Sequence, residues 1–136
     1  MTEVLGFGSP NDNYGLVTAD VDADGALDIV VFGTSGTPTL WSAGCTEGSW
    51  LHVELEGPAG NRAGWGARVE ATFGEAAAVR ELHGQRTQGQ GPPSVHLGLG
   101  EAETADVRVV WADGEVTEVM EIPGRRRVTI VHPTRR

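Results

Sequence analysis

Lysine is missing from the sequence, so every basic side chain other than the four histidines is an arginine. The 10 arginines face 19 acidic residues, which leaves a net charge of −9. Nucleic-acid-binding proteins carry a net basic surface, so this balance argues against a nucleic-acid partner. No apolar run approaches the roughly 18 residues of a membrane-spanning helix, so no membrane span is expected.

Cysteine is almost absent as well. Cys45 is the single cysteine, which excludes an intrachain disulfide. The first residues, Met1 to Val4, have neither the basic nor the apolar region of a secretion signal, so no signal peptide is visible. A chain of this size buries about two-thirds of its unfolded surface, so it needs no disulfide for stability. The length predicts one domain with a short appendage.

Glycine is abundant, and it divides the chain into short apolar runs. This spacing is typical of β-strands joined by tight turns. Residues 29–32 form a continuous apolar run, which predicts a strand covered on both faces, and residues 39–41 predict a second, short strand. Small polar residues at 42–49 predict a linker. We therefore expect a first domain at 1–49 and a second at 50–136.

The period-two alternation of half-buried strands begins at Trp50 and recurs at 67–73 and 107–111. Such alternation predicts that one face of each strand is apolar and buried. In the first of these strands the inward residues are Leu51, Val53 and Leu55, and the outward residues are His52, Glu54 and Glu56.

The turns between the later strands are less regular. Asp113-Gly114 predicts a hairpin turn, and a change of parity in the strand after it predicts a bulge near Glu118. A last strand is expected at 127–131. Residues 75–82 are good helix formers; we predict a strand paired with 67–73 and keep a short helix as the alternative.

The most specific motif lies at residues 20–28, where carboxylates occupy positions 1, 3, 5 and 9 of a loop with glycine at position 6. Side chains at alternate positions of a tight loop converge, and a hard cation relieves their repulsion. Because all the donors are oxygens, calcium is favoured over zinc or copper. The predicted calcium ligands are Asp20, Asp22, Asp24, the carbonyl of Ala26, and Asp28.

This loop differs from an EF-hand. The glutamate of position 12 is replaced by Val31, and the loop leads into a strand instead of a helix. The competing interpretation is an acidic surface turn that holds no metal, since aspartate and glycine are common in turns.

Two resemblances follow from these motifs. Residues 14–41 resemble one FG-GAP/VCBS repeat, the calcium-loop blade of integrin-α-like β-propellers. Residues 50–133 resemble the ASPIC/UnbV domain that follows such propellers. The residues that carry the second resemblance are Trp50 to Leu55, Asn61-Arg62, Gly64, Gly66 to Val69, Val95 to Gly100, Asp106 to Trp111, and Gly114.

The resemblance implies a secreted or cell-surface adhesion-like protein, although such domains also occur in some natural-product gene clusters. Three features depart from the family: one repeat instead of several, no visible signal peptide, and a turn at 111–114 that lacks the family's proline. A single blade cannot close a propeller, so its apolar faces are expected to pack on residues 50–133 or on another chain. The chain is either a minimal member or a fragment, and a homo-oligomer is a further expectation.

Two loops carry candidate ligand-binding residues. In loop 57–66 and just after it, arginine forks beside an aromatic ring suit a carboxylate, a sulfate or a sugar. In the competing interpretation Arg68 pairs with a strand carboxylate such as Glu70, and Asn61 caps its own turn. The amide-rich loop 84–94 suits a sugar or a peptide, or is an exposed linker. The predicted ligand-binding residues are Asn61, Arg62, Trp65 and Arg68.

These observations predict an all-β protein: a β-sandwich or barrel-like domain preceded by a calcium-binding β-hairpin repeat. The expected function is that of a calcium-stabilised binding or adhesion-type module, which recognises a glycan or protein through loops 57–66 and 84–94. No catalytic residues are assigned. The alternative is a small β-sandwich enzyme, a cyclase or isomerase of a natural-product pathway; an enclosed apolar pocket lined by titratable groups would support it, and a filled core would count against it.

Overall fold

The computed structural model describes residues 13–44, 47–84 and 89–135. In these ranges the regular elements are ten β-strands and one 3-10 turn, η1 (Pro133–Arg135), with no α-helix, which confirms the predicted all-β fold. None of the described segments is a helix long and apolar enough to span a membrane. The chain divides into two compact units, one of residues 1–45 and 85–92, the other of residues 46–84 and 93–136.

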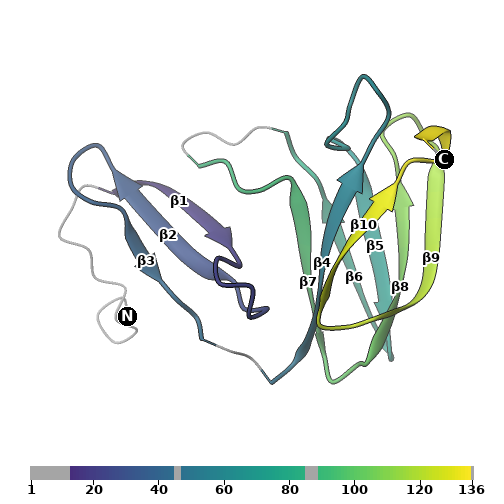
Figure 1. Cartoon of the computed structure of the whole chain (residues 1–136), viewed down its shortest axis with the longest axis horizontal. Helices are drawn as coiled ribbons and strands as arrows, with labels where there is room; N and C mark the ends of the chain where they lie inside the picture. Colours follow the sequence, from purple (N-terminus) through teal and green to yellow (C-terminus); the bar gives the residue numbers. More distant parts are fainter. Residues whose placement is uncertain (1–12, 45–46, 85–88, 136) are drawn as a thin grey trace. The chain divides into compact units, whose positions relative to one another are not determined.

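The first unit contains a three-stranded antiparallel sheet (Figure 1), in the order β1 (Asn13–Ala19), β2 (Asp28–Gly33) and β3 (Thr39–Trp41). The strands predicted at 29–32 and 39–41 are confirmed. The expected coverage of β2 on both faces is wrong, because its residues from Ile29 to Gly33 are only half-buried. A sheet of three short strands has too few neighbours on each face to bury its central strand.

Residues 89–92 of the loop between β6 and β7 also belong to the first unit. The backbone of Gly89 approaches β1 so closely that a Cβ atom there would lie 2.5 Å from the carbonyl oxygen of Leu16. Only glycine permits that approach. The described end of loop 84–94 therefore lies against β1, whereas residues 85–88 lie outside the described ranges.

The second unit is a sandwich of two sheets (Figure 1). The first sheet has the order β10–β4–β7, with β4 (Ser49–Glu56), β7 (Ser94–Gly100) and β10 (Arg126–Val131). The second sheet has the order β6–β5–β8–β9, with β5 (Arg68–Phe73), β6 (Ala76–Glu81), β8 (Thr104–Val110) and β9 (Val116–Pro123).

The core of this unit is apolar and draws on both sheets, as in other β-sandwiches. The predicted inward positions of β4 are confirmed, since Leu51, Val53 and Leu55 are all buried. His52, predicted on the outward face of β4, is only 5% exposed. It lies on the central strand of its sheet, directly opposite His96 of β7, and the two rings meet edge to face.

Three details of topology complete the unit. Residues 76–81 form β6, paired with β5 as predicted. The bulge of β9 lies at Met120 and Glu121, both opposite Asp106, and not at Glu118. Glu121 has a φ of 54°, and its N–H donates to the Asp106 carboxylate at 2.7 Å, which fixes the bulge. The last strand, β10, pairs in parallel with β4, a pairing that the sequence pattern does not reveal.

Candidate metal centre

The acidic loop at 20–28 joins β1 to β2. Ala23 and Gly25 both have positive φ, 62° and 94°, and these two left-handed residues wind the loop tightly. Within it, the Asp24 carboxylate accepts the N–H of Ala26 at 2.8 Å, and an Asp22 oxygen accepts the N–H of Asp24 at 3.3 Å. These short-range contacts are Asx turns, which hold the loop closed locally.

Three of the four predicted carboxylates converge. Asp20, Asp22 and Asp28 each offer an oxygen within 4.8 Å of the others, whereas Asp24 is not in this group. Asp20 is only 9% exposed, and its Oδ1 is buried with no hydrogen-bond partner among the described residues. A buried carboxylate oxygen without a partner is costly, and two neighbouring carboxylates raise that cost.

Asp28 is the most enclosed member of the group, with 2% of its surface exposed. Its two oxygens accept the N–H of Val21 at 2.9 Å and the N–H of Ala43 at 3.1 Å. These bonds, the one from Val21 foremost, hold the pKa of Asp28 below its usual range, and the Ser42 hydroxyl adds to the effect. Asp28 is therefore a fixed anion at the base of the loop.

This arrangement suits a hard divalent cation. Its donors are carboxylate oxygens, and a cation among them would satisfy the orphaned Asp20 oxygen and cancel the repulsion. Ala26, whose carbonyl is a predicted ligand, is buried in the same loop. Calcium ligation by these residues stays a prediction.

The second predicted site, loop 57–66, is held closed by its own hydrogen bonds. The amide of Asn61 donates to the carbonyl of Trp65 at 2.8 Å and accepts the N–H of Trp65 at 2.9 Å. The N–H of Gly57 donates to the carbonyl of Arg62. Trp65 is half-buried and packs against the core. Asn61 and Trp65 thus shape the loop, as in the competing interpretation of Asn61.

The two arginines of this site differ. A guanidinium nitrogen of Arg68 lies 3.2 Å from the Glu70 carboxylate, the pairing foreseen in that same interpretation. Arg62 is exposed and has no ion-pair partner among the described residues. Of the four predicted ligand-binding residues, Arg62 is therefore the one whose guanidinium is available to bind an anionic ligand.

A polar cluster around a buried histidine, which the sequence did not signal, lies at the end of β10. His132 is fully buried, its ring nitrogen Nε2 lies 3.1 Å from an Asp113 oxygen, and its ring meets Trp111 edge to face. The backbone N–H of Glu115 and, after it, His132 hold the pKa of Asp113 below its usual range. The cluster ties the C-terminal end to the β8–β9 turn.

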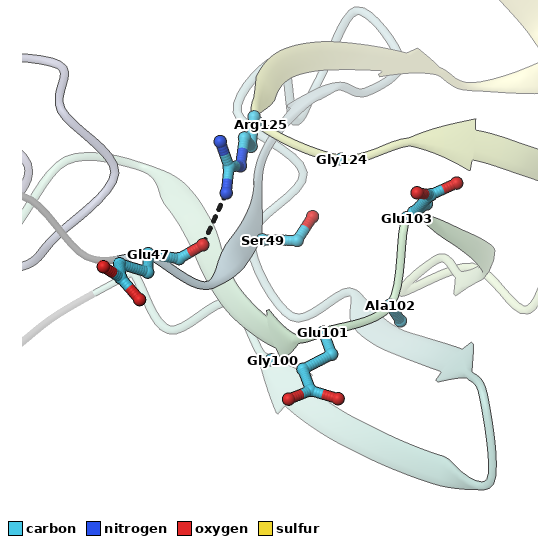
Figure 2. Close-up of a pocket in the computed structure, with 8 residues that line it drawn as sticks. All are labelled: Glu47, Ser49, Gly100, Glu101, Ala102, Glu103, Gly124 and Arg125. Carbon is cyan, nitrogen blue, oxygen red and sulfur yellow. Dashed lines mark hydrogen bonds between the residues drawn. The ribbon is translucent and has the colours of Figure 1, made fainter.

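A surface hollow of about 410 Å³ lies in the second unit where the segment that enters β4 meets the β7–β8 and β9–β10 turns (Figure 2). Arg125 donates across it to the backbone carbonyl of Glu47. Its lining includes three glutamates, Glu47, Glu101 and Glu103, and the Ser49 hydroxyl. Such a polar hollow is not the enclosed apolar pocket that would support the enzymatic alternative.

Comparison with known proteins adds one match. A family model described as ASPIC and UnbV matches residues 57–136, more than half of the chain. No curated protein matches the chain. The matched range includes loop 57–66 and six of the seven strands of the sandwich and begins after the acidic loop. The resemblance of residues 14–41 to an FG-GAP/VCBS repeat therefore stays a prediction.

Proposed function

The chain belongs to the ASPIC and UnbV family, and from that premise we propose that it is a calcium-stabilised β-rich binding module. Calcium occupies the loop at 20–28 and has a structural role, because it cancels the repulsion of the carboxylates and fixes the turn between β1 and β2. Loop 57–66 presents a polar surface to a glycan or a protein.

One observation carries the calcium proposal. The buried Oδ1 of Asp20 lacks a hydrogen-bond partner among the described residues, and two further carboxylates lie within 4.8 Å of its ligand atom. In an ordinary acidic turn the oxygens reach solvent or backbone N–H groups. A calcium ion with several oxygen ligands satisfies all three carboxylates together.

Calorimetric titration tests this proposal directly. Chelator-treated protein titrated with calcium chloride should bind one ion, and Asp22→Asn should weaken binding by at least about tenfold, since one charged ligand is lost. Asp22 is exposed, so its replacement leaves the fold intact. The matched control is Glu101→Gln, the same loss of charge in the second unit, which should bind as the native protein does. No heat of binding in the native protein would refute the calcium site.

The ligand-binding part of the proposal rests on Arg62. Its loop is pre-formed by the Asn61 amide, so little ordering is needed on binding, and its guanidinium suits a carboxylate or sulfate group. The described end of loop 84–94 lies against β1, so we take loop 57–66 as the contact to test first.

A panel of immobilised sulfated and carboxylated glycans tests this part. Arg62→Ala should abolish binding to any glycan that the native protein retains. Arg80→Ala, at an exposed arginine on β6, is the matched control and should leave binding unchanged. Equal losses in both variants would indicate non-specific charge attraction instead of a site.

A further inference from the structure

The segment that leaves β3 is attached to the acidic loop through Asp28. Ala43 is two residues beyond the end of β3, and its backbone N–H donates to Asp28 Oδ1 at 3.1 Å. The Ser42 hydroxyl also donates to this carboxylate. The other oxygen accepts the N–H of Val21, at the start of the loop. One buried carboxylate therefore bonds to two segments that lie 22 residues apart, at 21 and 43.

The same carboxylate belongs to the cation-binding group. Asp28 offers an oxygen within 4.8 Å of those of Asp20 and Asp22. Without a cation, repulsion among the three oxygens, two of which belong to the poorly exposed Asp20 and Asp28, acts to separate the carboxylates. Any outward movement of Asp28 lengthens its bonds to Ser42 and Ala43. With a cation bound, Asp28 is held in place, and its charge-assisted hydrogen bonds to that segment persist.

We propose that calcium at the 20–28 loop acts as a clamp on residues 42–43, the segment that leaves the first-unit sheet. The proposal rests on the calcium site proposed above and adds its regulatory consequence: calcium concentration controls how firmly this exit segment is held. Asp28 is the positioning residue, because it contacts both the cation group and the segment.

Amide hydrogen exchange measured by NMR tests the clamp on the full chain, in calcium and in chelator. If Ala43 exchanges only by openings that release the ion, calcium at 100 times its dissociation constant slows its exchange by up to about 100-fold. The amide of Leu97, in the core of the second unit, is the internal reference and should change little.

Two variants separate the clamp from the metal site. Ser42→Ala removes one contact to Asp28 and leaves the three carboxylates; Ala43 should exchange faster while calcium affinity stays the same. Asp22→Asn changes a carboxylate that does not hydrogen-bond to Ala43 among the described contacts. This variant should bind calcium more weakly. Saturating calcium should nevertheless restore the slow exchange of the Ala43 amide. Both variants avoid Asp28, whose replacement could unfold the first unit.

The outcomes are distinct. Calcium binding with less than about twofold change at Ala43, or with an equal change at Leu97, would overturn the clamp and leave the calcium site standing. Absence of calcium binding would overturn both proposals. Slowing confined to the first unit, with the expected behaviour of both variants, would establish the clamp.

Discussion

Loops 57–66 and 20–28 differ in how their polar side chains find hydrogen-bond partners. In loop 57–66 a neutral amide, that of Asn61, supplies one donor and one acceptor to Trp65, so the loop is complete in itself. In loop 20–28 the polar groups are carboxylates, which only accept. Backbone N–H groups satisfy some of their oxygens, but the buried Asp20 Oδ1 is left over. The Asn61 amide pairs within its own loop, whereas the carboxylates of loop 20–28 leave one buried oxygen without a donor among the described residues, which is the basis of the calcium proposal.

The largest expected effect concerns Asp20. At about 100 times its dissociation constant, calcium adds roughly 2.7 kcal/mol to the free energy of unfolding. Asp20→Asn should lose most of this gain, yet in chelator it should be at least as stable as the native protein, because it removes repulsion. Urea unfolding in calcium and in chelator measures both. If Asp20→Asn is less stable by the same amount in calcium and in chelator, the proposed role of calcium in loop 20–28 is wrong.

Loop 57–66 should be insensitive to metal. Asn61→Ala leaves the partly buried N–H and carbonyl of Trp65 without partners and should lower the free energy of unfolding by about 2 kcal/mol. The loss should be equal in calcium and in chelator. Asn61→Asp keeps the acceptor and loses the donor, so its loss should be smaller. Chemical denaturation followed by circular dichroism checks these values.

Acid should weaken the second unit through Asp113. Its pKa is lower in the folded state, so the folded chain binds fewer protons there than the unfolded chain does. The stabilisation is complete above the unfolded pKa and is lost as pH falls through the folded pKa. Asp113→Asn should therefore flatten the fall in stability at acid pH. Urea midpoints over an acid pH series measure it; an unchanged slope would count against the lowered pKa of Asp113, held down first by the Glu115 N–H and then by His132, as the cause.

The smallest effect is expected on the outer face of the four-stranded sheet. There Glu70 lies between Arg68 and Arg108, at 3.2 and 3.0 Å, so its charge already has partners. Glu70 is half-buried but both arginines reach solvent, so Glu70→Gln should cost less than about 1 kcal/mol. High salt should shrink that difference further, as thermal unfolding at two ionic strengths will show. A loss as large as that of Asn61→Ala would show that burial matters less than we argue.

Sequence patterns predicted what depends on neighbours in the chain. The period-two alternation of β4 identified Leu51 and Val53 as core residues, because a strand exposes alternate side chains to opposite faces. The spacing of aspartates in the 20–28 loop identified a group of which three converge. The two interpretations of Asn61 could not be separated, since both need the same residue on the same loop.

Such local patterns could not predict contacts between residues that are distant in the sequence. The alternation placed His52 on the outward face of β4 but could not predict its burial, which depends on neighbours across the sheet such as His96 of β7. The bulge of β9 was placed at the wrong residue, because its position depends on the register against β8 and on Asp106. The approach of Gly89 to β1 joins segments that share no local signal.

The sequence by itself therefore determined the strand content, the apolar faces and the acidic loop, since periodicity and loop spacing are local properties of the chain. The tertiary structure alone decided the parallel pairing of β10 with β4, the burial of His132 beside Asp113, and the attachment of Ala43 to Asp28. The physical reason is that each of these contacts joins residues distant in sequence. They become neighbours only when the sheets assemble and their shared apolar surfaces are buried.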